Sequence, residues 1–510
     1  MDKHFYITTP IYYVNDVPHI GHAYTTIACD VLSRYKRERG YKVFFLTGTD
    51  EHGQKVEKAA QANGETPLEL ADRVVKRFQS LWDKLDIDHT DFIRTTQERH
   101  KKAVEEIFRR IETKGDIYLG EYVDWYCTPC ETFWTETQLL DGNCPDCGRK
   151  TDKLKEESYF FRMSKYQDAL LRHIEENPEF IQPRSRRNEI LSFIKEGLRD
   201  LSISRTTFNW GIPVPGNDKH VIYVWFDALT NYISALGFPD DPDGNFKDFW
   251  PCTAHVIGKD ILRFHTVYWP TFLLAAGLPL PEKVLAHGWW TVEGQKMSKS
   301  LRNVVEPNML VDKYGVDAIR YFLMREVPFG LDGDFSHSAL VHRINSDLAN
   351  DLGNLVSRST AMLNKYFAGV LPESGPVDEI DQTLSQKFAD TIPVVDKQMD
   401  DLAFNKALQS IWELVSAANK YIDDTAPWAL AKDDTQKERL GTVMYNLLEA
   451  VRLIALFTTP FMPTTGQNII SILGGDPDAI RDDALFEWGG LQAGTKIDKA
   501  LPLFPRIEAD

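Results

Sequence analysis

A strand, a helix and a second strand follow one another within the first 47 residues, and this unit constrains the fold more than any other feature. Phe5-Tyr6-Ile7 is an apolar run typical of a strand. Apolar residues then recur at helical spacing from Tyr24 to Tyr35, and Gly40 is a typical helix stop. Residues 41–47 form a continuous apolar run of the kind found in buried parallel strands. Two strands joined in this way predict a parallel sheet, and therefore an α/β fold.

The tetrapeptide His19-Ile20-Gly21-His22 lies where the first strand turns into the helix. A helix N-terminus attracts anions, two imidazoles can donate to phosphate oxygens, and Gly21 lets a nucleotide approach the backbone. Ligands of parallel sheets bind beyond the carboxyl ends of the strands, so His19, His22 and Asp50 would share one edge. Taken alone, the tetrapeptide also fits an ordinary strand–helix corner, and Asp50 also fits a helix cap.

A second candidate for phosphate binding lies far downstream, in Lys296-Met297-Ser298-Lys299-Ser300. Lysine is a point charge on a flexible stem, which suits a loop that closes on phosphate. By itself, such a pentamer is equally typical of a solvated loop.

Four of the six cysteines form the pattern C-x2-C…C-x2-C, with thirteen residues between the two pairs. They are Cys127, Cys130, Cys144 and Cys147. Each pair can bind one edge of a metal ion from a tight turn, and four thiolates complete a tetrahedral shell. The spacing therefore predicts one structural zinc site, with no position left open for catalysis.

Composition limits the class of protein. At 510 residues the chain is long enough for several domains. Its formal net charge of −17 argues against broad, non-specific nucleic-acid binding. An RNA partner would therefore meet local basic patches, and the run from Arg184 to Arg187 is one candidate, although it also fits a solvated surface. No apolar run reaches the length of a membrane span and no signal peptide is visible, so we expect a cytoplasmic protein without a membrane partner.

An apolar slot and a helical second half complete the pattern. Trp225, Tyr232, Ile261 and Trp269 fall at helical spacings that could line a slot suited to a thioether, through sulfur–aromatic contact. The same spacings fit plain core packing.

After about residue 345, apolar residues recur with helical periodicity to the end, which predicts a helix bundle.

Together and in this order, the segments His19–His22 and Lys296–Ser300 resemble the two nucleotide signatures of class I aminoacyl-tRNA synthetases. From Ile7 to the Trp428 region, the chain resembles bacterial methionyl-tRNA synthetases. The resemblance implies an α/β, Rossmann-like parallel-sheet catalytic domain, a zinc-containing connective insertion, and a C-terminal α-helical anticodon-binding bundle. We expect the two catalytic halves at residues 1–117 and 218–281, the insertion at 118–217, the segment of the Lys296–Ser300 loop and its stem contacts at 282–345, and the bundle at 346–510.

The resemblance also implies roles at the positions that match the family's motifs. The implied catalytic groups are His19, His22, Lys296 and Lys299. The implied ATP contacts are His19, Gly21, His22, Lys259, Asp260, His287, Gly288 and Lys299. The implied methionine site comprises Ile11, Tyr13, Asp50, Trp225, Ala228, Tyr232, Ile261, His265 and Trp269. The implied anticodon contacts are Asn354, Arg358 and Trp428. Pro10 and Leu229 depart from some relatives, and we expect them to alter the shape of the pocket but not its amino acid.

The implied reaction has two steps and three substrates: ATP, L-methionine and tRNA(Met), including the initiator tRNA. The methionine carboxylate attacks the α-phosphate of ATP, which gives methionyl-adenylate and pyrophosphate. The ribose hydroxyl of the terminal adenosine of the tRNA then attacks the activated carbonyl. Mg²⁺ is expected to accompany ATP. Some relatives append a C-terminal dimerisation domain that this sequence lacks, so we expect a monomer.

Three other classes of protein share part of this pattern. A small-molecule nucleotidylyltransferase shares the H-x-G-H corner but needs neither a zinc insertion nor a long helical tail. A non-catalytic RNA-binding protein with a zinc ribbon would not need the phosphate loop. Synthetases for valine, isoleucine or leucine carry a large editing insertion, because apolar pockets separate near-isosteres poorly. Cysteine enzymes place zinc in the active site, whereas all four clustered thiolates here look structural.

Overall fold

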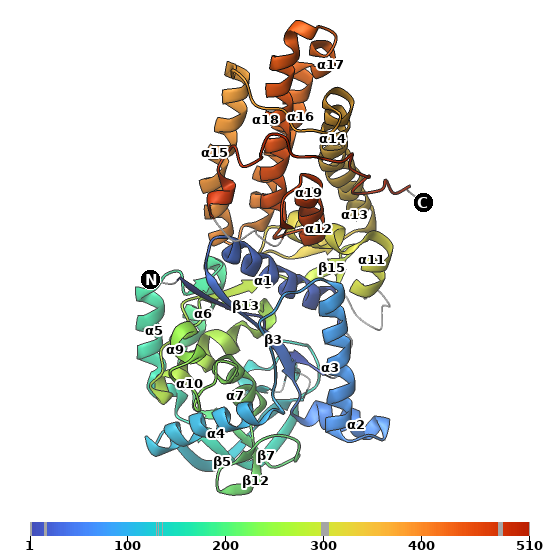
Figure 1. The fold of residues 1–510 in the computed structure, drawn as a ribbon. Coiled ribbons are helices and arrows are strands. Elements are labelled where there is room, and N and C mark those ends of the chain that lie inside the picture. The colour runs from blue at the N-terminus through green and yellow to red at the C-terminus, as the bar shows by residue number, and fades with distance from the viewer. Residues whose placement is uncertain are drawn as a thin grey trace.

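A parallel sheet organises the lower body of the molecule in the computed structural model, which describes residues 3–14, 18–128, 130, 132–134, 136–296, 305–477 and 483–508 (Figure 1). Neighbouring strands along this sheet are β4 (Asp91–Arg94), β3 (Lys42–Asp50), β1 (His4–Thr8), β13 (Ala254–Gly258), β14 (Val284–His287) and β8 (Ile181–Gln182), with β2 (Tyr12–Tyr13) beside the end of β3. Every pairing is parallel. The α/β fold with a Rossmann-like sheet is thus confirmed.

The order of the strands creates a crevice at β1. This strand pairs with β3 on one side, where Ile7 lies opposite Phe45, and with β13 on the other, where Ile7 lies opposite Ala254. The sheet therefore continues from β1 to β3 and β4 on one side, and to β13 and β14 on the other. Helix α1 (Ile20–Glu38) starts at this reversal point, where open α/β sheets bind their ligands.

Side chains on the two faces of the sheet pack into two separate hydrophobic cores. Ile7, Phe45 and Val256 join one core, which includes α1 and α3 (Pro67–Lys84). Tyr6 and Ile257 join the other core, with α4 (Glu98–Thr113) and α10 (Trp269–Ala276). A period of two along each strand explains this division, because consecutive side chains point to opposite faces.

A separate antiparallel sheet carries the cysteine cluster. Its order is β6 (Thr132–Trp134), β5 (Ile117–Cys127), β7 (Asp152–Phe161) and β9 (Leu201–Ser202). A smaller sheet joins β10 (Ser204–Arg205), β12 (Asn217–Ile222) and β11 (Pro213–Val214). Residues 220–224 are an apolar, strand-like run that follows the insertion, but they do not rejoin the parallel sheet. They pair instead with β10 and β11, and the parallel sheet resumes only at β13.

Short helices and one further sheet connect these layers. The helices are α2 (Gln54–Asn63), α5 (Gln167–Glu176), α6 (Arg184–Lys195), α7 (Val224–Leu229), α8 (Asn231–Ser234), α9 (Asn245–Phe249), α11 (Pro307–Tyr314) and α12 (Val316–Glu326). The sheet has the order β16 (Gln295–Lys296), β15 (Trp290–Val292) and β17 (Gly333–Phe335). It places the last described residue before the 297–304 segment next to the end of β14.

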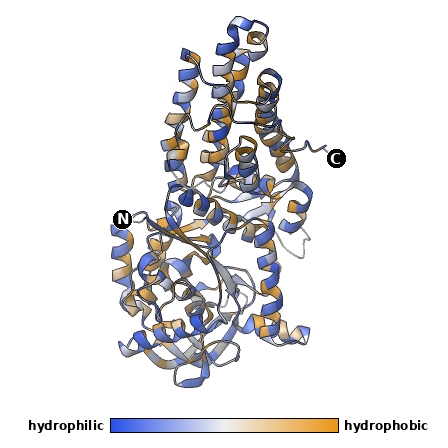
Figure 2. Cartoon of the chain, in the orientation of Figure 1, coloured by the Kyte–Doolittle hydropathy of each residue, from blue (hydrophilic) through white to orange (hydrophobic). Residues whose placement is uncertain are grey.

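A helical bundle rises from the sheet domain (Figure 1). It contains α13 (His337–Arg343), α14 (Asn354–Phe367), α15 (Glu379–Asp400), α16 (Phe404–Thr425), α17 (Pro427–Leu430), α18 (Lys437–Thr458) and α19 (Pro463–Ile472). Hydrophobic and hydrophilic stretches alternate along these helices (Figure 2), as expected for helices that bury one stripe. The predicted apolar positions Leu348, Leu352 and Leu355 are all buried.

One helix corrects an expectation. Residues 434–458 are long and apolar enough for a membrane span, whereas no segment of that kind was expected from the sequence. In the structure, 94% of its most apolar window is buried inside the protein. The helix includes α18, which contacts α14, α15, α16 and α19. Its apolar surface therefore forms the centre of the bundle.

Candidate active site

The predicted phosphate-binding histidines cap helix α1. His19 is the N-cap residue, and its ring nitrogen Nδ1 accepts the backbone N–H of Gly21 at 3.1 Å. The Nδ1 of His22 accepts the backbone N–H of His19, also at 3.1 Å. The two rings stack with their centroids 3.8 Å apart. A Cβ on Gly21 would lie only 3.0 Å from His19 Cε1, so glycine allows the ring to pack over this turn.

These bonds fix where each ring carries its proton. A nitrogen that accepts a hydrogen bond has no proton, so both Nδ1 atoms are bare and both Nε2 atoms are donors. Burial, with the adjacent His19, lowers the pKa of His22 well below its usual value, so this ring is neutral at pH 7. The turn thus offers two Nε2–H donors at the positive end of a 19-residue helix.

Asp50 ends strand β3 on the same edge of the sheet and is 3% exposed. Tyr13 pairs with it in register, so these two predicted methionine contacts are neighbours. The next residue, Glu51, is held by Arg94 at 2.6 Å and by the Thr49 hydroxyl at 2.7 Å. The loop after β3 is therefore tightly fixed.

The end of β14 is tied to α1 through His287. Its Nδ1 lies 2.8 Å from the carbonyl oxygen of Gly288, which can only accept, and its Nε2 lies 2.7 Å from the Thr25 hydroxyl on α1. Burial lowers the pKa of His287, so the neutral ring accepts from Thr25. A Cβ on Gly288 would lie 2.3 Å from the backbone of Leu331. Both residues have evident packing roles, and their contact with ATP stays a prediction.

Lys259 and Asp260 follow β13 and meet the loop before β17. The Lys259 ammonium lies 2.7 Å from both carboxylate oxygens of Asp332 and 4.3 Å from the centre of the Trp289 ring. Asp260 accepts the indole N–H of Trp289 at 3.2 Å. Both predicted ATP contacts therefore lie at the crevice, in an exposed charged group that the protein itself ties together.

The residues predicted to line the methionine slot pack together around His265, and their contact with methionine stays a prediction. Tyr232 and Trp269 belong to the buried core of this face, and Ile11, Trp225 and Ile261 pack against it. Among the remaining predicted members, Tyr13 packs against the same core, and Ala228 and His265 are buried. Among the described residues, the buried indole N–H groups of Trp225 and Trp269 have no acceptor, which leaves them available to a ligand.

His265 links the slot's polar groups. Its Nδ1 donates to the carbonyl of Ile261 at 3.0 Å, and its Nε2 accepts from the Tyr232 hydroxyl at 2.7 Å. Burial lowers the pKa of His265 to about 4, so the ring stays neutral. The Tyr232 hydroxyl is therefore held, and the slot presents no net charge to a side chain.

Two residues near the predicted slot, Phe264 and Asp227, were not expected there from the sequence. Phe264 stacks on Trp225 with the ring centroids 3.7 Å apart. Asp227 is fully buried between two histidines. The signal for Asp227 was present, because it is a charged residue inside the apolar run 224–229. Phe264 gave no signal, since a π-helical segment (Phe264–Tyr268) changes the helical spacing there.

The Lys296–Ser300 loop is only partly described. Gln295 and Lys296 form strand β16, paired with β15 directly after β14. The Lys296 side chain and residues 297–304, including Lys299, lie outside the described residues. The backbone thus enters the loop opposite Thr291, a few residues after the end of β14 at His287.

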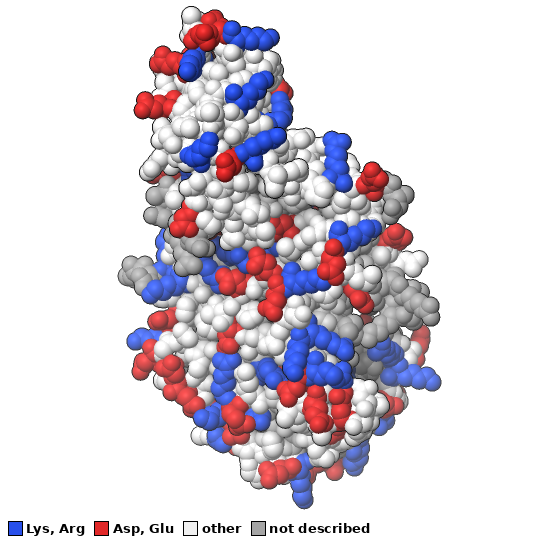
Figure 3. Space-filling model, turned by 45° about the vertical axis from the view of Figure 1, so that its right-hand side comes forward, with Lys and Arg blue, Asp and Glu red and all other residues white. Residues whose placement is uncertain are grey.

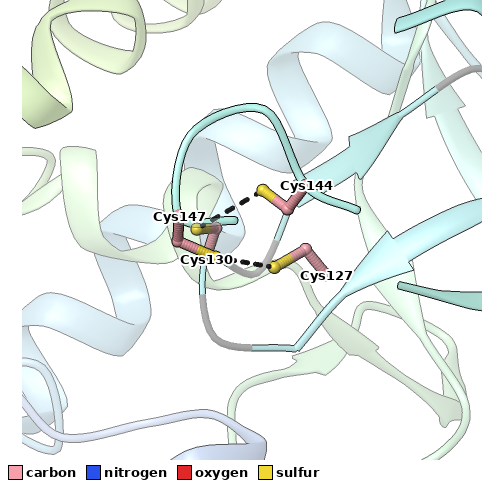
Figure 4. A group of neighbouring side chains, drawn as sticks. All are labelled: Cys127, Cys130, Cys144 and Cys147. Atoms are coloured by element: carbon pink, nitrogen blue, oxygen red, sulfur yellow. Dashed lines mark hydrogen bonds between the residues drawn. The ribbon is translucent and has the colours of Figure 1, made fainter. Parts of the chain in front are cut away.

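Four sulfur atoms converge in the insertion (Figure 4). All lie within 4.8 Å of one another, and Cys127–Cys147 and Cys130–Cys144 are 3.5 and 3.8 Å apart. Thiolates about 2.3 Å from a tetrahedral zinc lie about 3.8 Å from each other, so this group fits the metal closely. Cys29 and Cys252 are buried outside this cluster.

The predicted anticodon contacts lie together on the bundle. Asn354 begins α14, and Arg358 on the same helix pairs with Asp423 at 3.3 Å. Asp423 lies near the end of α16, immediately before α17, which carries Trp428 at the far end of the bundle from the sheet (Figure 1). Trp428 is 44% exposed, which is unusual for so large an aromatic side chain.

Charge on the surface is mixed. In the face drawn in Figure 3, Lys and Arg side chains gather in small groups among acidic ones. In the run from Arg184 to Arg187, Arg186 pairs with Glu189 and Arg187 donates to the carbonyl of Ile174. That run is therefore engaged in local contacts and is a weaker candidate for RNA than the bundle tip.

The comparisons with known proteins agree along the whole chain. The family model for class I tRNA synthetases of the methionine type matches residues 5–154 and 148–360, and the anticodon-binding domain of methionyl tRNA ligase matches 371–510. Methionine–tRNA ligases of Caldanaerobacter subterraneus and Clostridium tetani are 56% and 53% identical over all of this chain and 80% and 79% of their own lengths. The Mycobacterium tuberculosis methionyl-tRNA synthetase, solved with methionyl-adenylate, is 45% identical with a TM-score of 0.95, over 99% of this chain and 100% of its own. The chain belongs to the methionyl-tRNA synthetase family of class I aminoacyl-tRNA synthetases.

Proposed function

We propose that this chain activates L-methionine with ATP and transfers it to the 3′-terminal adenosine of tRNA(Met), including the initiator tRNA. One observation carries the proposal: two Nε2–H donors at the start of α1 meet the point where the strand order reverses, beside an aromatic slot. Family membership supplies the reaction, and the described side chains explain how the fold performs it.

His19 and His22 act on the phosphates. As the methionine carboxylate attacks the α-phosphate in line, negative charge grows on the leaving pyrophosphate. Donors that are already oriented stabilise that charge without reorganising, and both Nε2–H groups are held by bonds to Nδ1. We assign Lys296 and Lys299 to stabilise the same developing charge. Mg²⁺ brought with ATP would screen the phosphates, and Gly21, Lys259 and Asp260 would contact the nucleotide.

Methionine binds with its two ends in different surroundings. The Asp50 carboxylate would hold the ammonium group, and the slot would hold the side chain. Ring faces of Trp225, Tyr232 and Trp269 suit a polarisable thioether, which gains from sulfur–aromatic contact. A longer polar or charged side chain would lose its hydration there without a charged partner.

The other parts of the chain serve the tRNA and the fold. We propose that Cys127, Cys130, Cys144 and Cys147 hold one structural zinc ion within an insertion at residues 118–217, between catalytic halves at 1–117 and 218–281. Residues 282–345 would present the phosphate loop, and the bundle at 346–510 would read the anticodon through Asn354, Arg358 and Trp428. We propose that the working unit is a cytoplasmic monomer.

Charging of tRNA by the Trp428→Ala variant tests the proposal. An exposed tryptophan at the bundle tip offers a surface on which an unstacked base can stack, worth about 1–3 kcal/mol. The variant should therefore lose about tenfold or more in charging efficiency while its tRNA-independent ATP–pyrophosphate exchange stays at the wild-type rate.

Trp289→Ala is the matched control, because Trp289 is also exposed but lies at the crevice. It should impair exchange as well as charging. If Trp428→Ala lowers exchange and charging equally, Trp428 supports the fold and does not read tRNA.

A further inference from the structure

Asp227 is a buried carboxylate clamped between two imidazoles. One carboxylate oxygen lies 2.7 Å from Nδ1 of His52, and the other lies 2.7 Å from Nε2 of His100. Asp227 and His100 are fully buried, and His52 is 3% exposed. Burial alone would raise the pKa of Asp227, but the two imidazoles outweigh it and lower the pKa to about 2. The carboxylate is therefore ionised, and each facing ring nitrogen donates to it.

This clamp, formed by His52, Asp227 and His100, joins the two walls of the proposed methionine site. His52 follows Asp50 by two residues, in the loop after β3. Asp227 lies on α7, between Trp225 and Ala228. The bond from His52 to Asp227 thus spans from the loop that carries the ammonium partner to the helix that lines the slot.

The same loop is braced from a second direction. The backbone N–H of Gly53 donates to the carbonyl of Trp210 at 3.0 Å, and the Trp210 ring packs against the edge of His52 with the centroids 5.5 Å apart. These contacts fix the loop to the insertion but not to α7. His100 reaches Asp227 from α4, and its other nitrogen lies 2.9 Å from the Ser234 hydroxyl. It fixes α7 to α4 and α8, and among the described residues neither of its ring hydrogen bonds goes to the Asp50 loop.

We infer that His52 is a positioning residue for methionine: its bond to Asp227 sets the spacing between Asp50 and the α7 wall, and so the affinity for an amino acid of this length. The inference rests on the proposed function, in which Asp50 and α7 hold opposite ends of methionine. His100 supports the same carboxylate, but its role is confined to stability. Displacement of a bound group by about 1 Å can cost up to about a hundredfold in rate, so a small error in this spacing is measurable.

The two histidines use different nitrogens, which gives a reciprocal pair of substitutions. An asparagine amide nitrogen takes approximately the place of a histidine Nδ1, and a glutamine amide nitrogen takes that of Nε2. His52→Asn therefore keeps its donor on Asp227, whereas His52→Gln displaces it. For His100 the preference is reversed, with His100→Gln conservative and His100→Asn disruptive. All four variants keep an uncharged amide, so charge and polarity are matched.

The experiment measures methionine-dependent ATP–pyrophosphate exchange by the full chain, with the KM for methionine, the KM for ATP, kcat and the melting temperature of each variant. We expect His52→Gln to raise the KM for methionine at least about tenfold with the KM for ATP unchanged, and His52→Asn to restore it to within about threefold of wild type. His100→Asn should lower the melting temperature with a KM for methionine within about threefold of wild type.

Two results would overturn the inference. Equal values of the KM for methionine in His52→Gln and His52→Asn would show that the placement of the donor is irrelevant. Parallel changes in KM and melting temperature across all four variants would show that the clamp is only structural. Absence of methionine-dependent exchange in the wild-type chain would instead contradict the proposed function, so the two failures are distinguishable.

Discussion

At the scale of the residue, one imidazole ring performs two tasks at the start of α1. The Nδ1 of His19 satisfies the Gly21 amide at the helix terminus, and this bond forces the proton onto Nε2. His22 repeats the arrangement on the His19 amide. Capping and chemistry are thus coupled, because the hydrogen bond that caps the start of the helix also places the ring proton on Nε2.

Replacement of His19 by asparagine separates these tasks. Asparagine is among the best N-cap residues, so its side-chain oxygen should keep the cap, and the free energy of unfolding should change by less than about 1 kcal/mol. The Nε2 donor is lost, and kcat for methionine-dependent exchange should fall about 10²–10³-fold. Thermal unfolding and exchange kinetics check both halves.

The control for this variant is His19→Ala, which removes cap and donor together and should also destabilise the protein by about 1 kcal/mol. A His19→Asn enzyme with wild-type kcat would show that the imidazole serves the helix alone.

At the scale of the element, periodicity predicted most helices but missed the places where a helix changes type. The face Ile261–His265–Trp269 was predicted from a regular helix, whereas the chain passes through a 3₁₀ turn (Lys259–Ile261) and a π-helical segment (Phe264–Tyr268) before α10 begins. A π turn holds one residue more, so neighbours such as Phe264 enter the slot unforeseen. Strand β8 was missed because two residues carry no periodic signal.

The four-cysteine cluster is the element that the sequence predicted most completely. Cysteine spacing specifies both the ligands and the tight turns between them, and few other arrangements of four thiols satisfy it. By contrast, no pattern linked Asp227 to His52 and His100, because 175 and 127 residues separate these partners along the chain. Contacts of that range depend on how the sheet is assembled.

Loss of one cysteine should release the metal. Cys144 is 1% exposed and packs with Cys127 and Trp134 in a small separate core, so Cys144→Ser should reduce the zinc content from one ion per chain to less than about 0.1 and open this turn to protease. Elemental analysis and limited proteolysis measure the two effects.

Cys252→Ser is the matched control, because Cys252 is equally buried but lies outside the cluster, and it should retain one zinc ion. Retention of zinc by the Cys144→Ser variant would contradict a four-thiolate site.

At the scale of the whole molecule, one buried arginine joins the catalytic sheet to the bundle. Arg320 on α12 pairs with Asp30 of α1 at 2.6 Å and donates to the carbonyls of Pro460 and Phe461, between α18 and α19. Its other nitrogen reaches the carbonyl of Leu85 after α3 at 3.1 Å. The helix that begins at the two histidines predicted to bind phosphate is therefore fastened to the domain that would read tRNA.

The arrangement of domains followed from the sequence more readily than their contacts. The H-x-G-H corner, the cysteine spacing and the helical second half each predicted a part that the structure contains. Arg320 and Asp30 gave no such signal, since a single charge in an amphipathic helix usually faces solvent. Arg320 is buried because α1, the turn after α3 and the connection between α18 and α19 meet around it, and they do so only in the folded molecule.

Methionine-dependent ATP–pyrophosphate exchange, measured without tRNA against each of the twenty amino acids, tests the central claim most directly. The account predicts that L-methionine alone supports rapid exchange, because the neutral aromatic slot and the two Nε2–H donors together select and activate that substrate. Equal exchange with leucine or isoleucine, or no exchange with any amino acid, would contradict it.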